Sequence, residues 1–187
     1  VSRPRVTFLC RGSTEVGLGH VMRTRAVADA LAADGRTVVR LVAIGDDAAA
    51  SLLATRTYPV HVARDEAEAT AAAAATRPHV VVLDTTTLSR AGFDRVAAGA
   101  RTASLSPVFE RLEDVDACFH RARRHPDGRR PGWRLGPEWA VVRPEVVPIP
   151  DDRYAAATDP TRPLPVAVSM GGGDAANDTR RILERLR

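Results

Sequence analysis

The sequence is poor in aromatic residues and cysteine, and it contains no long apolar run. Aromatic side chains are 4% of the 187 residues, too few for a platform on which single-stranded nucleic acid could stack. The two cysteines, Cys10 and Cys118, cannot form a disulfide framework, and neither has metal-ligand spacing. No apolar run approaches the ~20 residues of a membrane span, and the N-terminal residues lack a signal-peptide pattern. We therefore expect a cytoplasmic protein that does not span a membrane and binds no metal.

The positive charge comes almost wholly from arginine. The formal net charge is +4, and the isoelectric point is about 10.0. The local basic cluster, Arg121–Arg134, contains Pro126, Gly128, Pro131 and Gly132, which predict a loop. We favour a solvated loop there and expect no nucleic-acid partner. An anionic small substrate, such as a nucleoside diphosphate, suits the charge equally well.

Strand-like and helix-like segments alternate through the first half of the chain. The strand-like segments are nearly continuous runs of valine, leucine and isoleucine, which is typical of a parallel sheet covered on both faces. The alternation predicts an α/β fold with a Rossmann-like, doubly wound parallel sheet. The predicted strands are Val6–Cys10, Val38–Ala43, Val60–Ala63, His79–Asp84 and Thr102–Leu105, and the predicted helices are His20–Asp34, Asp46–Thr55, Asp65–Thr76 and Ser89–Gly99.

The composition changes towards the C-terminus. Residues 1–146 form the predicted Rossmann-like domain, and residues 147–165, rich in proline and aspartate, form a predicted linker. Residues 166–187 contain a strand-like segment, Val166–Met170, then a glycine turn and a helix-like segment. A lone strand–helix unit cannot bury its own core. We interpret it as the start of a second α/β domain, and the chain as a fragment of a two-domain protein. The alternative is that this unit packs onto the first domain.

The turn Gly17-Leu18-Gly19-His20 lies between the first predicted strand and the first predicted helix. Its glycines allow a sharp turn, and His20 falls at the N-terminal end of the helix. Histidine titrates nearer to neutral pH than other side chains, so His20 is a candidate for proton transfer, although it could also be a solvated turn residue. The turn lacks both the third glycine of a dinucleotide fingerprint and the lysine of a P-loop. We therefore expect no nicotinamide cofactor.

Two other segments carry candidate site residues. Asp84 and Thr85 end the fourth predicted strand and belong at the same sheet edge as His20. Asp84 either contacts substrate or caps the following turn. The turn Gly171-Gly172-Gly173-Asp174 can bring backbone amides close to a phosphate, or it is only a flexible turn.

Four segments occur in an order that resembles one family. The chain resembles the UDP-sugar hydrolases of pseudaminic acid biosynthesis and the related spore-coat polysaccharide glycosyltransferases, which look like two-Rossmann-domain glycosyltransferases. The sharpest similarity is in the Gly-x-Gly-His-x-x-Arg turn and in a Gly-Pro-Glu-Trp-Ala-Val-Val-Arg-Pro-Glu segment. The four segments are Val16–Arg23, Val80–Asp84, Leu135–Glu145 and Val168–Asn177.

The resemblance implies an inverting reaction at an anomeric carbon, with UDP as the leaving group. His20 would be the general base that deprotonates water or the hydroxyl of a sugar or glycan acceptor. No acidic metal-binding motif is visible in the sequence, so we expect no metal and no other cofactor. The remaining candidate site residues are Gly17, Gly19, Arg23, Asp84 and Thr85 for substrate binding, and Gly171, Gly172, Gly173 and Asp174 for the diphosphate.

The chain departs from the family near the expected sugar pocket. Leu9-Cys10-Arg11 replaces Arg-x-Asp, Thr85-Thr86 replaces His or Ser followed by Tyr, and Ser106-Pro107 replaces a pair of aspartates. These departures imply a different sugar, an acceptor other than water, or loss of activity. A non-catalytic relative that keeps the fold and binds a sugar or a partner is therefore the alternative function.

Overall fold

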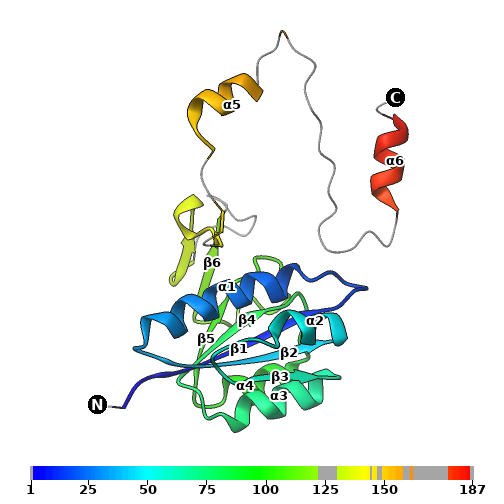
Figure 1. The fold of residues 1–187 in the computed structure, drawn as a ribbon. Helices are drawn as coiled ribbons and strands as arrows, with labels where there is room; N and C mark the ends of the chain where they lie inside the picture. The colour runs from blue at the N-terminus through cyan, green and yellow to red at the C-terminus, as the bar shows by residue number, and fades with distance from the viewer. Residues whose placement is uncertain are drawn as a thin grey trace.

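The computed structural model describes residues 2–121, 130–143, 145–146, 149–157, 161 and 177–185. Within these ranges, seven parallel strands form one sheet in the order β3-β2-β1-β4-β5-β6-β7 (Figure 1). The first six positions of this order are those of the doubly wound Rossmann fold. The predicted α/β fold with a Rossmann-like parallel sheet is therefore confirmed.

The strands are β1 Arg5–Gly12, β2 Val38–Gly45, β3 Val60–Ala63, β4 Val80–Asp84, β5 Arg101–Ser104, β6 Ala117–His120 and β7 Trp133–Leu135. The helices are α1 Gly19–Asp34, α2 Asp47–Leu53, α3 Glu66–Ala75, α4 Arg90–Ala97, α5 Asp151–Ala157 and α6 Asp178–Arg185, with a 3-10 turn, η1, at Pro137–Trp139.

Every strand and helix predicted before residue 106 is present, with ends shifted by at most two residues. Strands β6 and β7 were not predicted, because segments of four and three residues are too short to show a periodic pattern. Helix α5 lies inside the predicted linker, and its first turn contains two aspartates that suit a helix N-terminus. The predicted strand Val166–Met170 and the middle of the basic segment, residues 122–129, lie outside the described residues.

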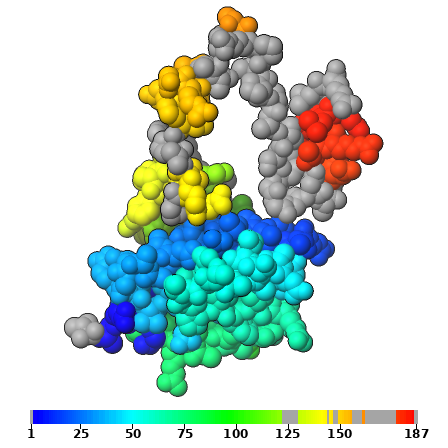
Figure 2. Space-filling model, viewed as in Figure 1, coloured from blue at the N-terminus to red at the C-terminus, as the bar shows by residue number. Residues whose placement is uncertain are grey.

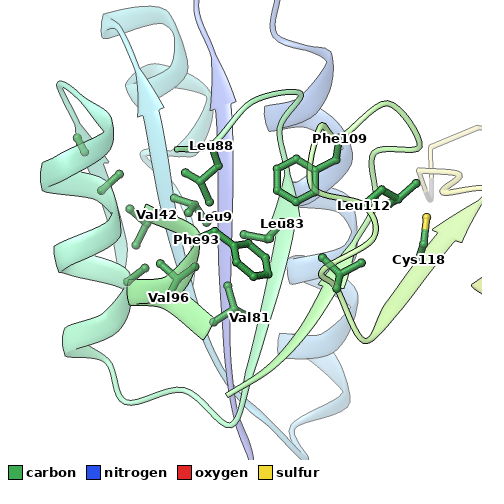
Figure 3. Packing of buried hydrophobic residues seen from close by; sticks show 14 of the residues in the cluster. Leu9, Val42, Val81, Leu83, Leu88, Phe93, Val96, Phe109, Leu112 and Cys118 are labelled. Atoms are coloured by element: carbon green, nitrogen blue, oxygen red, sulfur yellow. The ribbon is translucent and has the colours of Figure 1, made fainter. Parts of the chain in front are cut away.

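Helices cover both faces of the sheet and bury a separate apolar cluster on each. Phe8 and Leu41 pack on the face of α1 and α2. Leu9 and Leu83 pack on the face of α3 and α4 (Figure 3). Alternate residues of a strand point to opposite faces, so a strand buried on both sides is apolar throughout. Trp133 of β7 is buried in the same cluster as Leu9 and Leu83.

The loop between β1 and α1 is fixed at both ends. The Gly17 N–H donates to the Ser13 carbonyl at 2.9 Å, which closes the loop, and the Thr14 N–H and hydroxyl donate to Asp46 at 2.9 and 2.7 Å. Asp46 also caps α2 by accepting from the Ala49 N–H at 3.1 Å. These bonds, those from Thr14 first, lower the pKa of Asp46 to about 2. The loop that precedes His20 is thereby tied to the start of α2.

The two C-terminal helices stand apart from the sheet. Helices α5 and α6 lie away from the layers built by α1–α4 (Figures 1 and 2). Ile182 and Leu183 of α6 are exposed, so its apolar side is not covered by the described part of the chain. No helix in the described ranges combines the length and apolar character needed to cross a bilayer.

Candidate active site

The candidate site lies where strand order changes direction in the sheet. Strand β1 pairs with β2 on one side and with β4 on the other, and Cys10 is opposite Asp84 in the β1–β4 register. Chain connections from β1 and β4 run to opposite halves of the sheet. In open α/β sheets, ligands bind at the carboxyl ends of strands at such a point. Helix α1 begins here with His20 in its first turn.

Asp84 joins β4 to α1. Its side chain is fully buried, and its two carboxylate oxygens accept hydrogen bonds from three side chains of α1. Arg23 donates through Nε at 2.8 Å and through Nη2 at 2.5 Å, and the Thr24 hydroxyl donates at 3.2 Å. His20 Nδ1 lies 2.6 Å from Oδ1. Residues three and four apart share one face of a helix, so α1 presents all three donors to a single carboxylate.

These contacts assign the tautomer of His20. Both oxygens of Asp84 already accept from Arg23 and Thr24, so in the neutral tautomer that hydrogen-bonds to Asp84 the proton of the 2.6 Å contact lies on Nδ1 of His20. Arg23 Nη2 also lies 3.1 Å from Nδ1, but both atoms are then donors, and their contact is no hydrogen bond. Nε2 of the neutral ring therefore carries the lone pair. An aspartate paired in this way orients an imidazole and stabilises the imidazolium that forms when it takes a proton.

The buried carboxylate also affects its other neighbours. Its hydrogen bonds raise the pKa of Arg23 above the ordinary arginine value, so this side chain is a permanent cation. Burial, and then the charge of Asp84, raises the pKa of Cys10 to about 12. Reactive cysteines need a thiolate, so Cys10 is a neutral packing thiol and no nucleophile.

His20 forms part of the lining of an open cleft of about 480 Å³. This volume lies in the range of small-molecule sites. The Phe119 and Trp139 rings line one part of the cleft, with their centroids 5.3 Å apart. A smaller cavity of about 260 Å³ lies against α1. Met22 and Asp29 line it, but none of the three side chains that contact Asp84 does. The polar and charged side chains in the lining of the larger cleft are His20, Arg23, Ser106, His120 and Arg121.

Of the residues predicted from the sequence, the structure brings His20, Arg23 and Asp84 together. From the sequence, Asp84 was expected to contact substrate or to cap the following turn. Neither role includes its contacts with His20 and Arg23. Thr85 is buried, and its hydroxyl donates to the Thr87 carbonyl at 2.9 Å within its own turn, away from the cleft lining. The predicted diphosphate turn Gly171–Asp174 lies outside the described residues. Among described residues, no three His, Cys, Asp or Glu side chains gather as a metal site would require.

The two predicted glycines play different parts in the loop. Gly17 has a φ of +90°, a backbone conformation that residues other than glycine rarely adopt. Gly19 is the first residue of α1, and a Cβ placed there would meet no atom within 4 Å. Gly17 is therefore required by the backbone, whereas Gly19 leaves open space beside His20.

Several residues of the cleft lining were not among the candidate site residues predicted from the sequence. Ser106 follows β5, His120 ends β6, and Trp139 ends the 3-10 turn. They are distant in sequence and share no spacing motif. For Ser106 the signal was its place after the fifth predicted strand, where the resemblance puts the sugar pocket. His120 is the last residue of β6, which was itself too short to predict.

No family model matches the chain, and a comparison with curated proteins finds no match either. Fold and site together define the class of the protein at a coarse level. It is an α/β protein with a Rossmann-like parallel sheet and a buried aspartate–histidine pair at the edge of a cleft.

Proposed function

We propose that the chain is the base-carrying part of a nucleotide-sugar hydrolase or glycosyltransferase. The contact between His20 Nδ1 and the buried Asp84 carboxylate carries the proposal. It leaves Nε2 to accept a proton, on the side of the ring away from the buried carboxylate, in a residue that lines a cleft. The ordered resemblance of four segments to UDP-sugar hydrolases and glycosyltransferases supports the choice of substrate.

In the proposed reaction, Nε2 takes a proton from water or from a sugar or glycan hydroxyl. The oxygen forms a bond to the anomeric carbon as the bond from that carbon to the diphosphate oxygen breaks, with inversion. The electron pair leaves on UDP, and Asp84 stabilises the imidazolium of His20. Negative charge develops on the diphosphate and needs amides or cations beside it. We assign this role to Gly171–Asp174.

The composition of the cleft favours a nucleotide sugar. Its described lining combines aromatic and aliphatic side chains with arginine and histidine and contains no acidic residue. Arg23 is paired with Asp84, and Arg121 adds a second positive charge to the lining, which favours an anionic ligand such as a diphosphate sugar. The proposal places the reaction in the cytoplasm, where the thiols of Cys10 and Cys118, both free, stay reduced.

Replacing His20 by asparagine tests the proposal. The asparagine amide can keep the hydrogen bond of Nδ1 to Asp84 but has no counterpart of Nε2. In the protein expressed from its whole gene, we expect His20→Asn to lower UDP release from UDP-sugars by about 10²- to 10⁴-fold. His61→Asn is the matched control, because His61 is exposed and contacts Glu68.

Unchanged UDP release in His20→Asn would overturn the role of His20. A wild-type protein that binds a sugar or protein partner, but releases no UDP from any nucleotide sugar, would instead identify the non-catalytic alternative.

A further inference from the structure

The hydroxyl of Ser106 has no hydrogen-bond partner, although the residue is fully buried. Among the described residues, the only other buried side-chain nitrogen or oxygen atoms without a partner are Nε atoms of Arg11 and Arg56. Each of those arginines has another guanidinium nitrogen close to a carboxylate, Glu66 for Arg11 and Asp29 for Arg56. Within the described part of the chain, Ser106 is therefore the buried residue whose whole side-chain polar group has no hydrogen-bond partner.

The neighbouring Ser104 shows that the local backbone does not need the Ser106 hydroxyl. The Ser104 hydroxyl donates to the Ser106 carbonyl at 2.9 Å and accepts from the Ser106 N–H at 3.1 Å. These two bonds hold the backbone just beyond β5. The Ser106 side chain contributes nothing to that arrangement, and a buried hydroxyl without a partner destabilises a folded protein. An alanine would avoid this cost.

The position of Ser106 indicates what could supply the missing partner. It lines the same cleft as His20, and the Phe119–Trp139 ring pair forms an apolar part of that lining. A pyranose ring combines apolar C–H faces with hydroxyl and amide substituents, so it matches aromatic rings and an isolated serine hydroxyl together. A serine hydroxyl can both donate and accept, which suits either kind of substituent.

We propose that the Ser106 hydroxyl binds a hydroxyl or amide substituent of the sugar ring held in the cleft beside His20. This inference rests on the proposed function and names the residue that recognises the sugar. Ser106 is a binding residue in this role and takes no part in proton transfer. Its hydrogen bond forms with the ligand, so its loss weakens binding without weakening the fold.

Ser106→Ala and Ser104→Ala separate binding from folding. Binding of UDP-N-acetylglucosamine, UDP-glucose and free N-acetylglucosamine is measured by calorimetry, alongside thermal unfolding, in the protein expressed from its whole gene. For Ser106→Ala we expect Kd of the bound probes to rise about tenfold, or ~1.4 kcal/mol, with Tm equal to or above that of the wild type. For Ser104→Ala we expect Tm to fall, because two hydrogen bonds of the turn are lost.

The inference is overturned if Ser106→Ala binds every probe as the wild type does, or if its Tm falls as in Ser104→Ala. It is also overturned if the wild type binds none of the three probes. The two proposals fail separately. Loss of UDP release in His20→Asn with unchanged binding in Ser106→Ala overturns only the role of Ser106. Weaker binding in Ser106→Ala with full UDP release in His20→Asn overturns only the proposed reaction.

Discussion

His20 Nδ1 and Asp84 Oδ1 lie 2.6 Å apart although 64 positions separate the two residues in the sequence. Because they would act in one proton transfer, their substitutions should not be additive. We expect Asp84→Asn to lower kcat for UDP release by about 10²- to 10⁴-fold with little change in KM. The double variant with His20→Asn should be no slower than the slower single variant. Steady-state UDP release measures this, and fully additive losses would show that the residues act independently.

The planar guanidinium of Arg23 donates two hydrogen bonds to the carboxylate of Asp84. Lysine cannot reproduce the two bonds that Arg23 makes through Nε and Nη2. We expect Arg23→Lys to lower the free energy of unfolding by about 1–2 kcal/mol, a modest value because a third of the side chain is exposed. Urea denaturation measures the loss. Arg36→Lys is the control: its side chain is 85% exposed and pairs with Asp34, so it should unfold as the wild type does. Equal stability of the two variants would refute a structural role for the paired hydrogen bonds of Arg23.

The two glycines before His20 should respond oppositely to alanine. Gly17→Ala forces a side chain into a left-handed φ of +90°, and we expect a loss of about 1–2 kcal/mol in the free energy of unfolding. Gly19→Ala places its methyl group in open space at the start of α1, so stability should stay the same or rise slightly. Denaturant unfolding of both variants distinguishes them, and equal losses would contradict the described loop geometry.

Cys10 should make stability fall at alkaline pH. Burial, and then the charge of Asp84, raises its pKa from 9.0 to about 12, so the folded protein keeps the neutral thiol while the unfolded chain ionises. This contribution is complete below pH 9 and is lost as the pH rises towards 12. In Cys10→Ala, the free energy of unfolding should therefore decline less steeply with pH over that range than in the wild type.

Thiol labelling gives a second readout for Cys10. The native protein at neutral pH should react only as fast as it unfolds, because both cysteines are buried and burial also raises the pKa of Cys118, to about 11. Labelling of native Cys10 at the rate of a free thiol would contradict this expectation.

The sequence predicted where helices and strands lie better than it predicted which residues they bring together. Continuous apolar runs such as Val80–Asp84 mark strands because both faces of the sheet are covered. Strands β6 and β7 were not predicted, because three or four residues are too few to show the alternation of a strand. Helix α5 was not predicted, because the proline and aspartate residues around it are typical of a linker.

The candidate site shows the same division. His20 was visible from its turn and Asp84 from its strand end, but their contact depends on β4 lying next to β1, which no local pattern encodes. The unpaired state of Ser106 was equally hidden, because it depends on Ser104 already satisfying the adjacent backbone. Hydrogen-bond partners are properties of the folded chain.

Three donors of α1 share one carboxylate of β4, and this has a consequence for the order of synthesis. A nascent chain that has emerged only through α3 already contains His20, Arg23 and Thr24 but not the acceptor that orients them. Closing contacts over more than 60 positions is slow compared with forming a helix. The imidazole therefore acquires its fixed orientation only after β4 has left the ribosome and entered the sheet beside β1.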